Sequence, residues 1–159
     1  MLIVPDTNLI ISAWVYDGRP FKFFEAALDA GYEFVICPAI IDEIHEVLQR
    51  PKFLRVKKKP DFTPPPLSDF LAIVHVVEPI PVSLTVGDKK DVMLFGCAAA
   101  AGADYIISGD KTVHEVVSYG NIKVRKIAEI MDESSLKPLP WTSQPPDDPS
   151  PSPQNPTTP

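Results

Sequence analysis

The stretch "LIVPDTNLII", residues 2–11, places an acidic residue where a short buried strand ends and a helix begins. Asp is a favoured cap of helix N-termini, which is the simpler explanation of Asp6 taken alone. The same carboxylate could also hold a metal ion at the edge of a sheet. A second apolar run, "YIISGD" at 105–110, ends in the same way at Asp110. If the two strands are parallel neighbours, both carboxylates reach one crevice, because parallel sheets bind ligands beyond the carboxyl ends of their strands.

Short apolar runs alternate with helical patterns along the rest of the chain. Strands are expected at 2–5, 33–37, 74–77, 104–110 and 121–127, and helices at 8–15, 18–31, 38–50, 67–73, 91–102, 114–120 and 128–133. Strands separated by helices imply right-handed crossovers between them. The alternation therefore predicts an α/β fold whose parallel sheet is covered by helices on both faces.

The composition indicates one soluble domain. The chain has 159 residues, of which 45% are hydrophobic and 23% charged, enough for a single core. We expect the domain to span residues 1–136 and the segment 137–159 to be disordered, because its prolines and small polar residues bury too little apolar surface. There is no pattern of a signal peptide or of a membrane span of about 18 apolar residues. With only Cys37 and Cys97, no disulfide framework is expected, and the predicted location is the cytoplasm.

The net charge of −6 does not favour a protein that binds nucleic acid through electrostatics alone. Two local basic runs could act against that balance. They consist of Lys57, Lys58 and Lys59 in one loop, and of Lys89 and Lys90 before a helix. Solvated loop charges are the simpler interpretation of each run, and contact with nucleic-acid phosphates is the alternative.

The predicted helix at 38–50 supplies a third acid. At about 100° per residue, one arc of this helix collects Ile40, Ile41, Ile44, Val47 and Leu48. Asp42 and Glu46 fall opposite that arc, and Glu43 lies at its border. A boundary Glu commonly extends to solvent. Glu43 is nevertheless the acid of this helix that could reach from the packed face toward the edge of the sheet.

A fourth acidic segment is "GDKKDVMLFGC", residues 87–97, in which Asp88 and Asp91 stand three positions apart at a helix start. This spacing fits a variant of the capping box. It fits equally well a carboxylate that points from a helix N-terminus into a shared site, so both interpretations remain open.

Acids from four element ends would repel one another if they met on one side of the sheet. A pair about 4 Å apart costs about 4 kcal/mol at an effective dielectric constant near 20. A divalent cation among them offsets this cost, and oxygen ligands favour Mg²⁺ or Mn²⁺ over Zn²⁺. Such a site suits phosphodiester chemistry, because the metal lowers the pKa of a water, orients it and neutralises charge on the phosphate.

Three motifs of this chain carry a resemblance to a known family. These motifs are Asp-Thr-Asn after the first strand, "PAIIDEIHEVLQRPKF" at 38–53 and "DKKDVMLFGCAAAAGADYIISGD" at 88–110. Together they resemble the motifs of the PIN domain family. The similarity is greatest to the VapC-like toxins of toxin-antitoxin systems and covers nearly all of residues 1–136. It implies a three-layer α/β/α sandwich with a central parallel sheet, and metal-dependent endoribonuclease activity.

The resemblance also implies roles for individual residues. The catalytic acids that bind the metal correspond to Asp6, Glu43, Asp91 and Asp110. Positions that support these acids correspond to Thr7, Asn8, Asp88 and Ser108. Lys89 and Lys90 depart from the family pattern, which usually carries further acids near the position of Asp91. These lysines either weaken metal occupancy or place cations beside the path of the phosphates.

The implied partners are an RNA substrate, a small antitoxin that covers the cleft, and a second copy of the chain in a homodimer. No interaction with a membrane is expected. One alternative is a PIN-like module that binds RNA or a partner with weak or no cleavage. A second alternative is a phosphotransferase or phosphatase with Asp6 as nucleophile. Asn8 counts against it, because the usual partner acid would stand at that position.

Overall fold

The chain folds around a six-stranded sheet in the computed structural model, which describes residues 1–16, 18–55, 64–85 and 87–133. The strands are β1 (Leu2–Pro5), β2 (Glu33–Ile36), β3 (His75–Val76), β4 (Tyr105–Ile107), β5 (Ser118–Tyr119) and β6 (Ile122–Arg125). The basic run at 57–59 and the segment 137–159 lie outside the described residues. No helix in the described part of the chain is long and apolar enough to cross a membrane.

Parallel pairing dominates this sheet, whose strand order is β3-β2-β1-β4-β6-β5. β1 pairs in parallel with β2 on one side and with β4 on the other. Ile3 and Val4 of β1, and Ile106 and Ile107 of β4, are fully buried. Continuous apolar strands of this kind are typical of a parallel sheet covered on both faces.

The sheet is not wholly parallel, contrary to the expectation from the sequence, because the pairing at one edge is antiparallel. β5 pairs with β6 in the antiparallel direction. The helix expected at 114–120 is therefore wrong, because α7 (Lys111–His114) is a single short turn and the chain then enters β5. Gly120 has a φ of 58°, which suits the tight Gly-Asn turn between the two strands. Local hairpin chemistry thus overrides the weak helical pattern in this segment.

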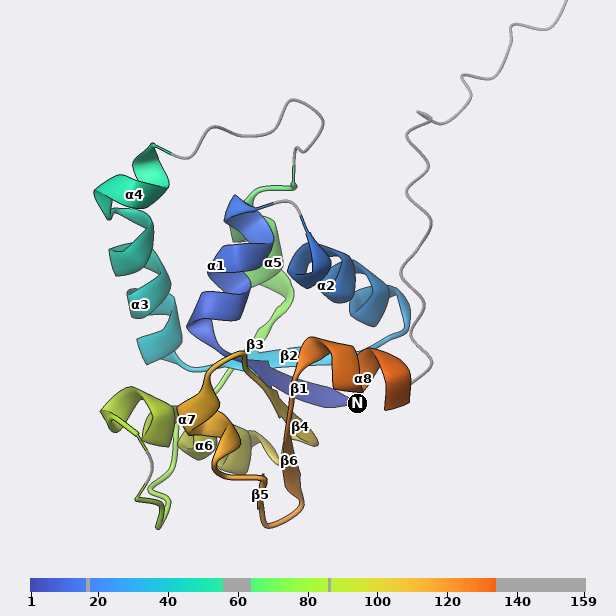
Figure 1. Ribbon diagram of the computed structural model, residues 1–159, viewed down its shortest axis with the longest axis vertical. Helices are drawn as coiled ribbons and strands as arrows, with labels where there is room; N and C mark the ends of the chain where they lie inside the picture. The colour runs from blue at the N-terminus through green and yellow to red at the C-terminus, as the bar shows by residue number, and fades with distance from the viewer. Residues whose placement is uncertain (17, 56–63, 86, 134–159) are drawn as a thin grey trace, which may run out of the picture.

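Helices cover both faces of the sheet, which confirms the predicted three-layer arrangement (Figure 1). On one face, α6 packs against β1, β2 and β4. On the opposite face, α1 and α2 pack together, and α2 contacts α8. Besides α7, the helices are α1 (Thr7–Val15), α2 (Arg19–Asp29), α3 (Pro38–Leu48), α4 (Pro51–Leu54), α5 (Leu67–Ile73), α6 (Lys89–Ala101) and α8 (Ile127–Glu133).

An aromatic cluster fills the core between α1, α2, α5 and β2. It consists of Trp14, Phe21, Phe23, Phe24, Phe34 and Phe70. The ring centroids of Phe24 and Phe34 are 4.9 Å apart, and those of Phe24 and Phe70 are 5.1 Å apart. Such edge and tilted contacts add to the free energy gained from burial. The cluster anchors this helical layer to the sheet.

The winding of the chain changes direction beside β1. The chain runs from β1 outward to β2 and β3, and then returns to β4 on the other side of β1. A topological switch point of this kind opens a crevice beyond the carboxyl ends of the two central strands. Asp6 directly follows β1, and Ser108 directly follows β4.

Candidate active site

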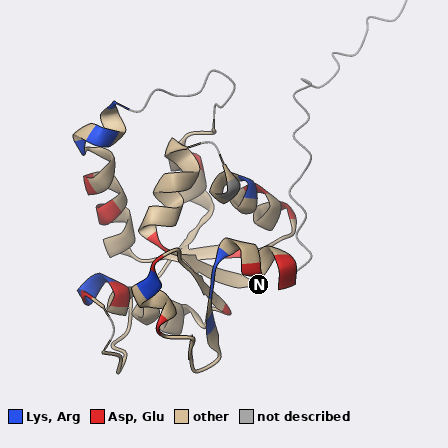
Figure 2. Cartoon of the chain, in the orientation of Figure 1, with Lys and Arg blue, Asp and Glu red and all other residues tan. Residues whose placement is uncertain are grey.

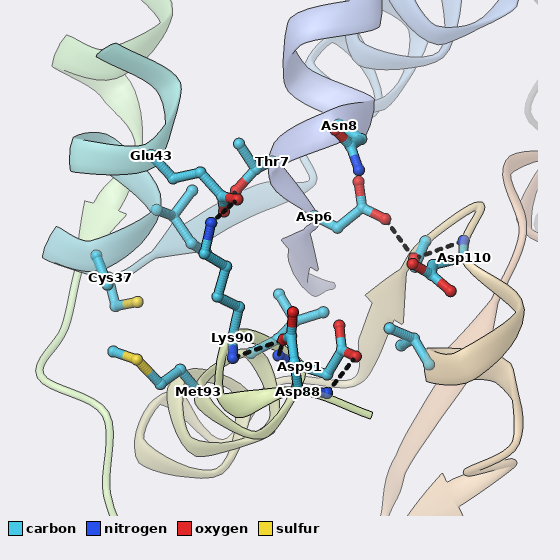
Figure 3. A pocket seen from close by; sticks show the side chains of 15 residues that line it. Asp6, Thr7, Asn8, Cys37, Glu43, Asp88, Lys90, Asp91, Met93 and Asp110 are labelled. Carbon is cyan, nitrogen blue, oxygen red and sulfur yellow. Dashed lines mark hydrogen bonds and ion pairs between the residues drawn. The ribbon is translucent and has the colours of Figure 1, made fainter. Parts of the chain in front are cut away.

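A cavity of about 290 Å³ lies at this crevice, and polar side chains from several elements line it (Figure 3). All four predicted metal-binding acids line the cavity: Asp6, Glu43, Asp91 and Asp110. The four predicted supporting residues line it as well: Thr7, Asn8, Asp88 and Ser108. The structure therefore brings together side chains that are far apart in the sequence.

The predicted RNA-binding lysines have different positions. Lys90 lines the cavity, whereas Lys89 is exposed and is not among the described lining residues. The run at 57–59 lies outside the described residues. Figure 2 shows basic and acidic residues next to one another at the start of α6. Within the described residues, Lys90 is therefore the only lysine that lines the cavity together with the acids.

Asp6 is held at the edge of the sheet by the pairing of β1 with β4. Pro5 lies opposite Ile107, and the Asp6 N–H donates to the Ile107 carbonyl oxygen at 3.0 Å. This register places Ser108 beside Asp6, and the Ser108 hydroxyl donates to Asp6 Oδ2. Asp6 Oδ1 accepts from the Leu9 N–H at 2.7 Å, so Asp6 also caps α1.

Asp110 is connected to the same serine. Its backbone N–H donates to Ser108 Oγ at 3.0 Å, and its Oδ1 accepts from the Thr112 N–H at 2.8 Å, which caps α7. Ser108 is fully buried, and its carbonyl oxygen accepts from His114 Nε2 at 2.7 Å. Ser108 therefore links the two acids that follow β1 and β4.

Glu43 occupies the position on α3 that the helical pattern predicts. The apolar arc of this helix is packed, Asp42 and Glu46 are exposed, and the Glu43 side chain is 24% exposed. Glu43 Oε2 accepts from Thr7 Oγ1 at 2.7 Å. Its Oε1 lies 2.7 Å from Lys90 Nζ. Both oxygens of this carboxylate therefore have partners from other elements.

Asp88 and Asp91 confirm the predicted capping arrangement, and they also lie at the cavity. They form a capping box, in which Asp88 Oδ1 accepts from the Asp91 N–H at 3.1 Å and Asp91 Oδ2 accepts from the Asp88 N–H at 3.2 Å. Both side chains also line the cavity. Gly87 precedes them with a φ of 51°, and a Cβ at this position would overlap Asp91 Oδ2. The close approach to Asp91 thus requires a glycine.

Two carboxyl groups in the cavity hold protons more tightly than usual. Burial raises the pKa of Asp6 above its ordinary value of 3.8, although hydrogen bonds to its carboxylate oppose the shift. Burial is also the largest cause that raises the pKa of Asp91, and the negative charges of Asp88, Asp110 and Glu43 add to it. Carboxylates whose charged forms are disfavoured in this way favour a bound cation.

The chemistry of these donors fits a hard divalent cation, because carboxylate oxygens are the ligands that Mg²⁺ and Mn²⁺ prefer. Within the described residues, however, no three His, Cys, Asp or Glu side chains are already arranged to enclose an ion. Each predicted ligand instead has at least one oxygen in a hydrogen bond within the protein. The acids therefore share a cavity, and side-chain rotation is needed before they could share an ion.

Two features of the cavity are missed by sequence reasoning. The contact between Lys90 and Glu43 joins residues 47 positions apart, and no local pattern predicts it. Cys37 is fully buried and lines the cavity, where a hydrogen bond with Cys97 lowers the pKa of its thiol. The position of Cys37 directly before Pro38, at a predicted helix start, is the one signal that could have placed it near the site.

The family model for the PIN domain matches residues 3–112. Because this match covers more than half of the chain, the protein belongs to the PIN domain family, and the resemblance inferred from its motifs is confirmed. The matched region includes all four acids of the cavity. The comparison with curated proteins gives no significant match.

Among solved structures, the fold is similar to that of a chain in VapBC2 from Rickettsia felis, whose crystal structure contains a DNA fragment from their promoter. The TM-score is 0.53 at 14% sequence identity. The similarity covers 79% of this chain and 98% of the VapBC2 chain. At such low identity it shows a shared fold.

Proposed function

We propose that this protein is an endoribonuclease that uses Mg²⁺ or Mn²⁺ to hydrolyse RNA phosphodiester bonds. The observation that carries this proposal is the meeting of Asp6, Glu43, Asp91 and Asp110 at one cavity, although they come from four separate parts of the chain. Membership of the PIN domain family supports the same assignment.

The four acids are the proposed metal ligands. A bound metal supplies an activated water and neutralises charge on the phosphate. The protein's own groups orient the acids. Ser108 fixes Asp6, Thr7 fixes Glu43, and the capping box with Asp88 fixes Asp91. Such partners of metal-binding side chains commonly contribute to metal affinity.

Basic residues predicted from the sequence are the proposed contacts for the RNA backbone. Lys89 and the run at 57–59 would neutralise phosphates, which the net charge of −6 otherwise repels. We assign to these lysines an effect on affinity that decreases with salt concentration, and to the acids an effect on the chemical step.

We further propose that the protein acts as the toxin of a toxin-antitoxin pair in the cytoplasm, as a homodimer that a small antitoxin inhibits. The similarity in fold to VapBC2 supports this assignment. The two cysteines are free and buried, which is compatible with a reducing compartment.

A second candidate function is a PIN-like module that binds RNA or a partner but cleaves weakly. The ion pair between Lys90 and Glu43 favours it, because a predicted metal ligand is already paired with a cation of the protein. An RNA cleavage assay distinguishes the two functions, because a pure binding module binds single-stranded RNA but leaves its length unchanged in any metal.

The test is the incubation of purified protein with mixed single-stranded RNA in Mn²⁺, in Mg²⁺ and in a chelator. Wild-type protein should cleave in metal and not in chelator. Asp6→Asn should lower the rate by about 100-fold or more, because it removes one charged metal ligand. Cleavage that is unchanged in Asp6→Asn would identify a contaminating nuclease and contradict the proposal.

Glu43→Gln and Glu46→Gln form a matched pair for the same assay. Both substitutions remove one negative charge from α3, but Glu43 lines the cavity and Glu46 is exposed and pairs with Arg50. Only Glu43→Gln should reduce cleavage. Equal losses in both variants would show that the effect is one of net charge.

A further inference from the structure

Lys90 is the only basic side chain among the described residues that line the acidic cavity. Its backbone is fixed at the start of α6, where the Lys90 N–H donates to Asp88 Oδ1 at 2.8 Å. Its side chain extends from α6 toward α3, and its Nζ lies 2.7 Å from Glu43 Oε1 (Figure 3). A cation of the protein therefore occupies one oxygen of a proposed metal ligand.

The pair differs from a surface ion pair nearby, in which Glu46 of α3 contacts Arg50, just after the end of that helix. The side chains of Arg50 and Glu46 are 48% and 68% exposed, whereas Glu43 is only 24% exposed. Water screens the charge of Glu43 less, so its attraction to a nearby cation is stronger. The other oxygen of Glu43 is held by the Thr7 hydroxyl at 2.7 Å. A divalent metal bound to Glu43 Oε1 would lie close to the Lys90 ammonium, and the two cations would repel each other.

We propose that Lys90 is a built-in counter-ion that competes with the divalent metal for Glu43 and so sets the metal affinity of this site. This inference rests on the proposed function, because it concerns the same cavity. In the metal-free protein, the Lys90 ammonium offsets part of the repulsion among the acids. When a metal binds, the ammonium leaves Glu43 for solvent, which its 57% exposure allows.

Calorimetric titration of the full chain with MnCl₂, and separately with MgCl₂, tests this competition. Lys90→Gln removes the competing charge and should lower the Kd for the metal by about three- to tenfold. Lys90→Arg keeps the charge and should stay close to the wild-type Kd. Lys89→Gln is the matched control, because it removes the same charge from an exposed side chain one position away. It should change the Kd by less than about twofold.

Thermal unfolding gives a second readout that separates competition from a merely structural role. Without metal, Lys90→Gln should have a lower Tm than wild type, because Glu43 loses its partner. Saturating MnCl₂ should raise the Tm of Lys90→Gln by more than it raises that of wild type, because tighter binding stabilises the folded state more. A purely structural lysine would leave the metal-induced increase unchanged, which would overturn the proposal.

The outcomes separate this inference from the proposed function. If wild type and Lys90→Gln bind Mn²⁺ with the same Kd, or if Lys90→Gln binds more weakly, competition is overturned and the metal site stands. Equal tightening in Lys89→Gln and Lys90→Gln also overturns it, because net charge then explains the change. If neither wild type nor any variant binds Mn²⁺, both the metal site and the role of Lys90 are overturned.

Discussion

The aromatic cluster and the acidic cavity lie in the same small domain, but they have opposite physical characters. The cluster joins α1, α2, α5 and β2 through aromatic rings that pack against one another. The cavity collects carboxylates, and burial together with neighbouring negative charges raises the pKa of Asp91 there. Caps, a serine and one lysine keep these acids in place.

The difference indicates where stability and function are located in this fold. Burial of aromatic rings stabilises the domain at every pH, because no charge is involved. In the cavity, the raised pKa values of Asp6 and Asp91 mean that charging these acids opposes folding, which is typical of a site arranged for a ligand. The following substitutions test this division, from the largest expected effect to the smallest.

Phe34→Ala should give the largest loss of stability, about 3–5 kcal/mol in the free energy of unfolding. Phe34 is 2% exposed and contacts three other rings of the cluster, so the truncation leaves a cavity in the core. Urea denaturation measures the change. Leu28→Ala, at a side chain 37% exposed on α2, is the control and should lose far less. Equal losses would contradict the dominant role of the cluster.

Gly87→Ala should have the next largest effect, about 1–3 kcal/mol of lost stability, because the residue has a positive φ and its Cβ would overlap Asp91 Oδ2. The cost arises at the cavity and not in the core, so RNA cleavage should fall with it. Gly109→Ala is the control for stability, because a Cβ there meets open space. Wild-type stability and cleavage in Gly87→Ala would show that the capping segment adapts easily.

Asp6→Asn should have the smallest effect on folding, and of opposite sign. Burial raises the pKa of Asp6, so the folded protein binds this proton more tightly than the unfolded chain does. The stability of wild type should therefore fall as the pH rises from 3.8 through the raised pKa. Asn removes this dependence and keeps the capping bond with Leu9, so the metal-free variant should be the more stable one at neutral pH.

Denaturation at a series of pH values, without metal, measures this effect. Asp29→Asn at the exposed end of α2 removes the same charge and is the control. If Asp6→Asn is less stable than Asp29→Asn at neutral pH, the expected stabilisation by Asp6→Asn is contradicted. That result would show that the hydrogen bonds of the Asp6 carboxylate outweigh the cost of its burial.

The sequence predicted most of what depends on local pattern. Asp6 and Asp110 were identifiable because each follows an apolar run, and parallel strands bring such ends together. Glu43 was identifiable from its angle on α3. The roles of these acids as metal ligands stay a prediction, because convergence at a cavity is a geometric observation.

What the sequence could not predict depends on contacts between distant side chains or on very short elements. The pair of Lys90 and Glu43 requires the relative placement of α3 and α6, which no local pattern contains. β5 has two residues, too few for an alternating pattern, so the helix expected at 114–120 was wrong. The Gly-Asn turn that follows β5 is the sequence signal of a hairpin in this segment.

The hydrogen bond from the Asp6 N–H to the Ile107 carbonyl oxygen has a consequence for tolerance to insertions. The spacing of Asp6 and Ser108 is determined by the ladder between β1 and β4, and not by the length of chain that connects them. We therefore expect the distance between Asp6 and Ser108 to be maintained when loops between β2 and β4 are lengthened or shortened. The same should hold for circular permutants whose new termini lie in those loops.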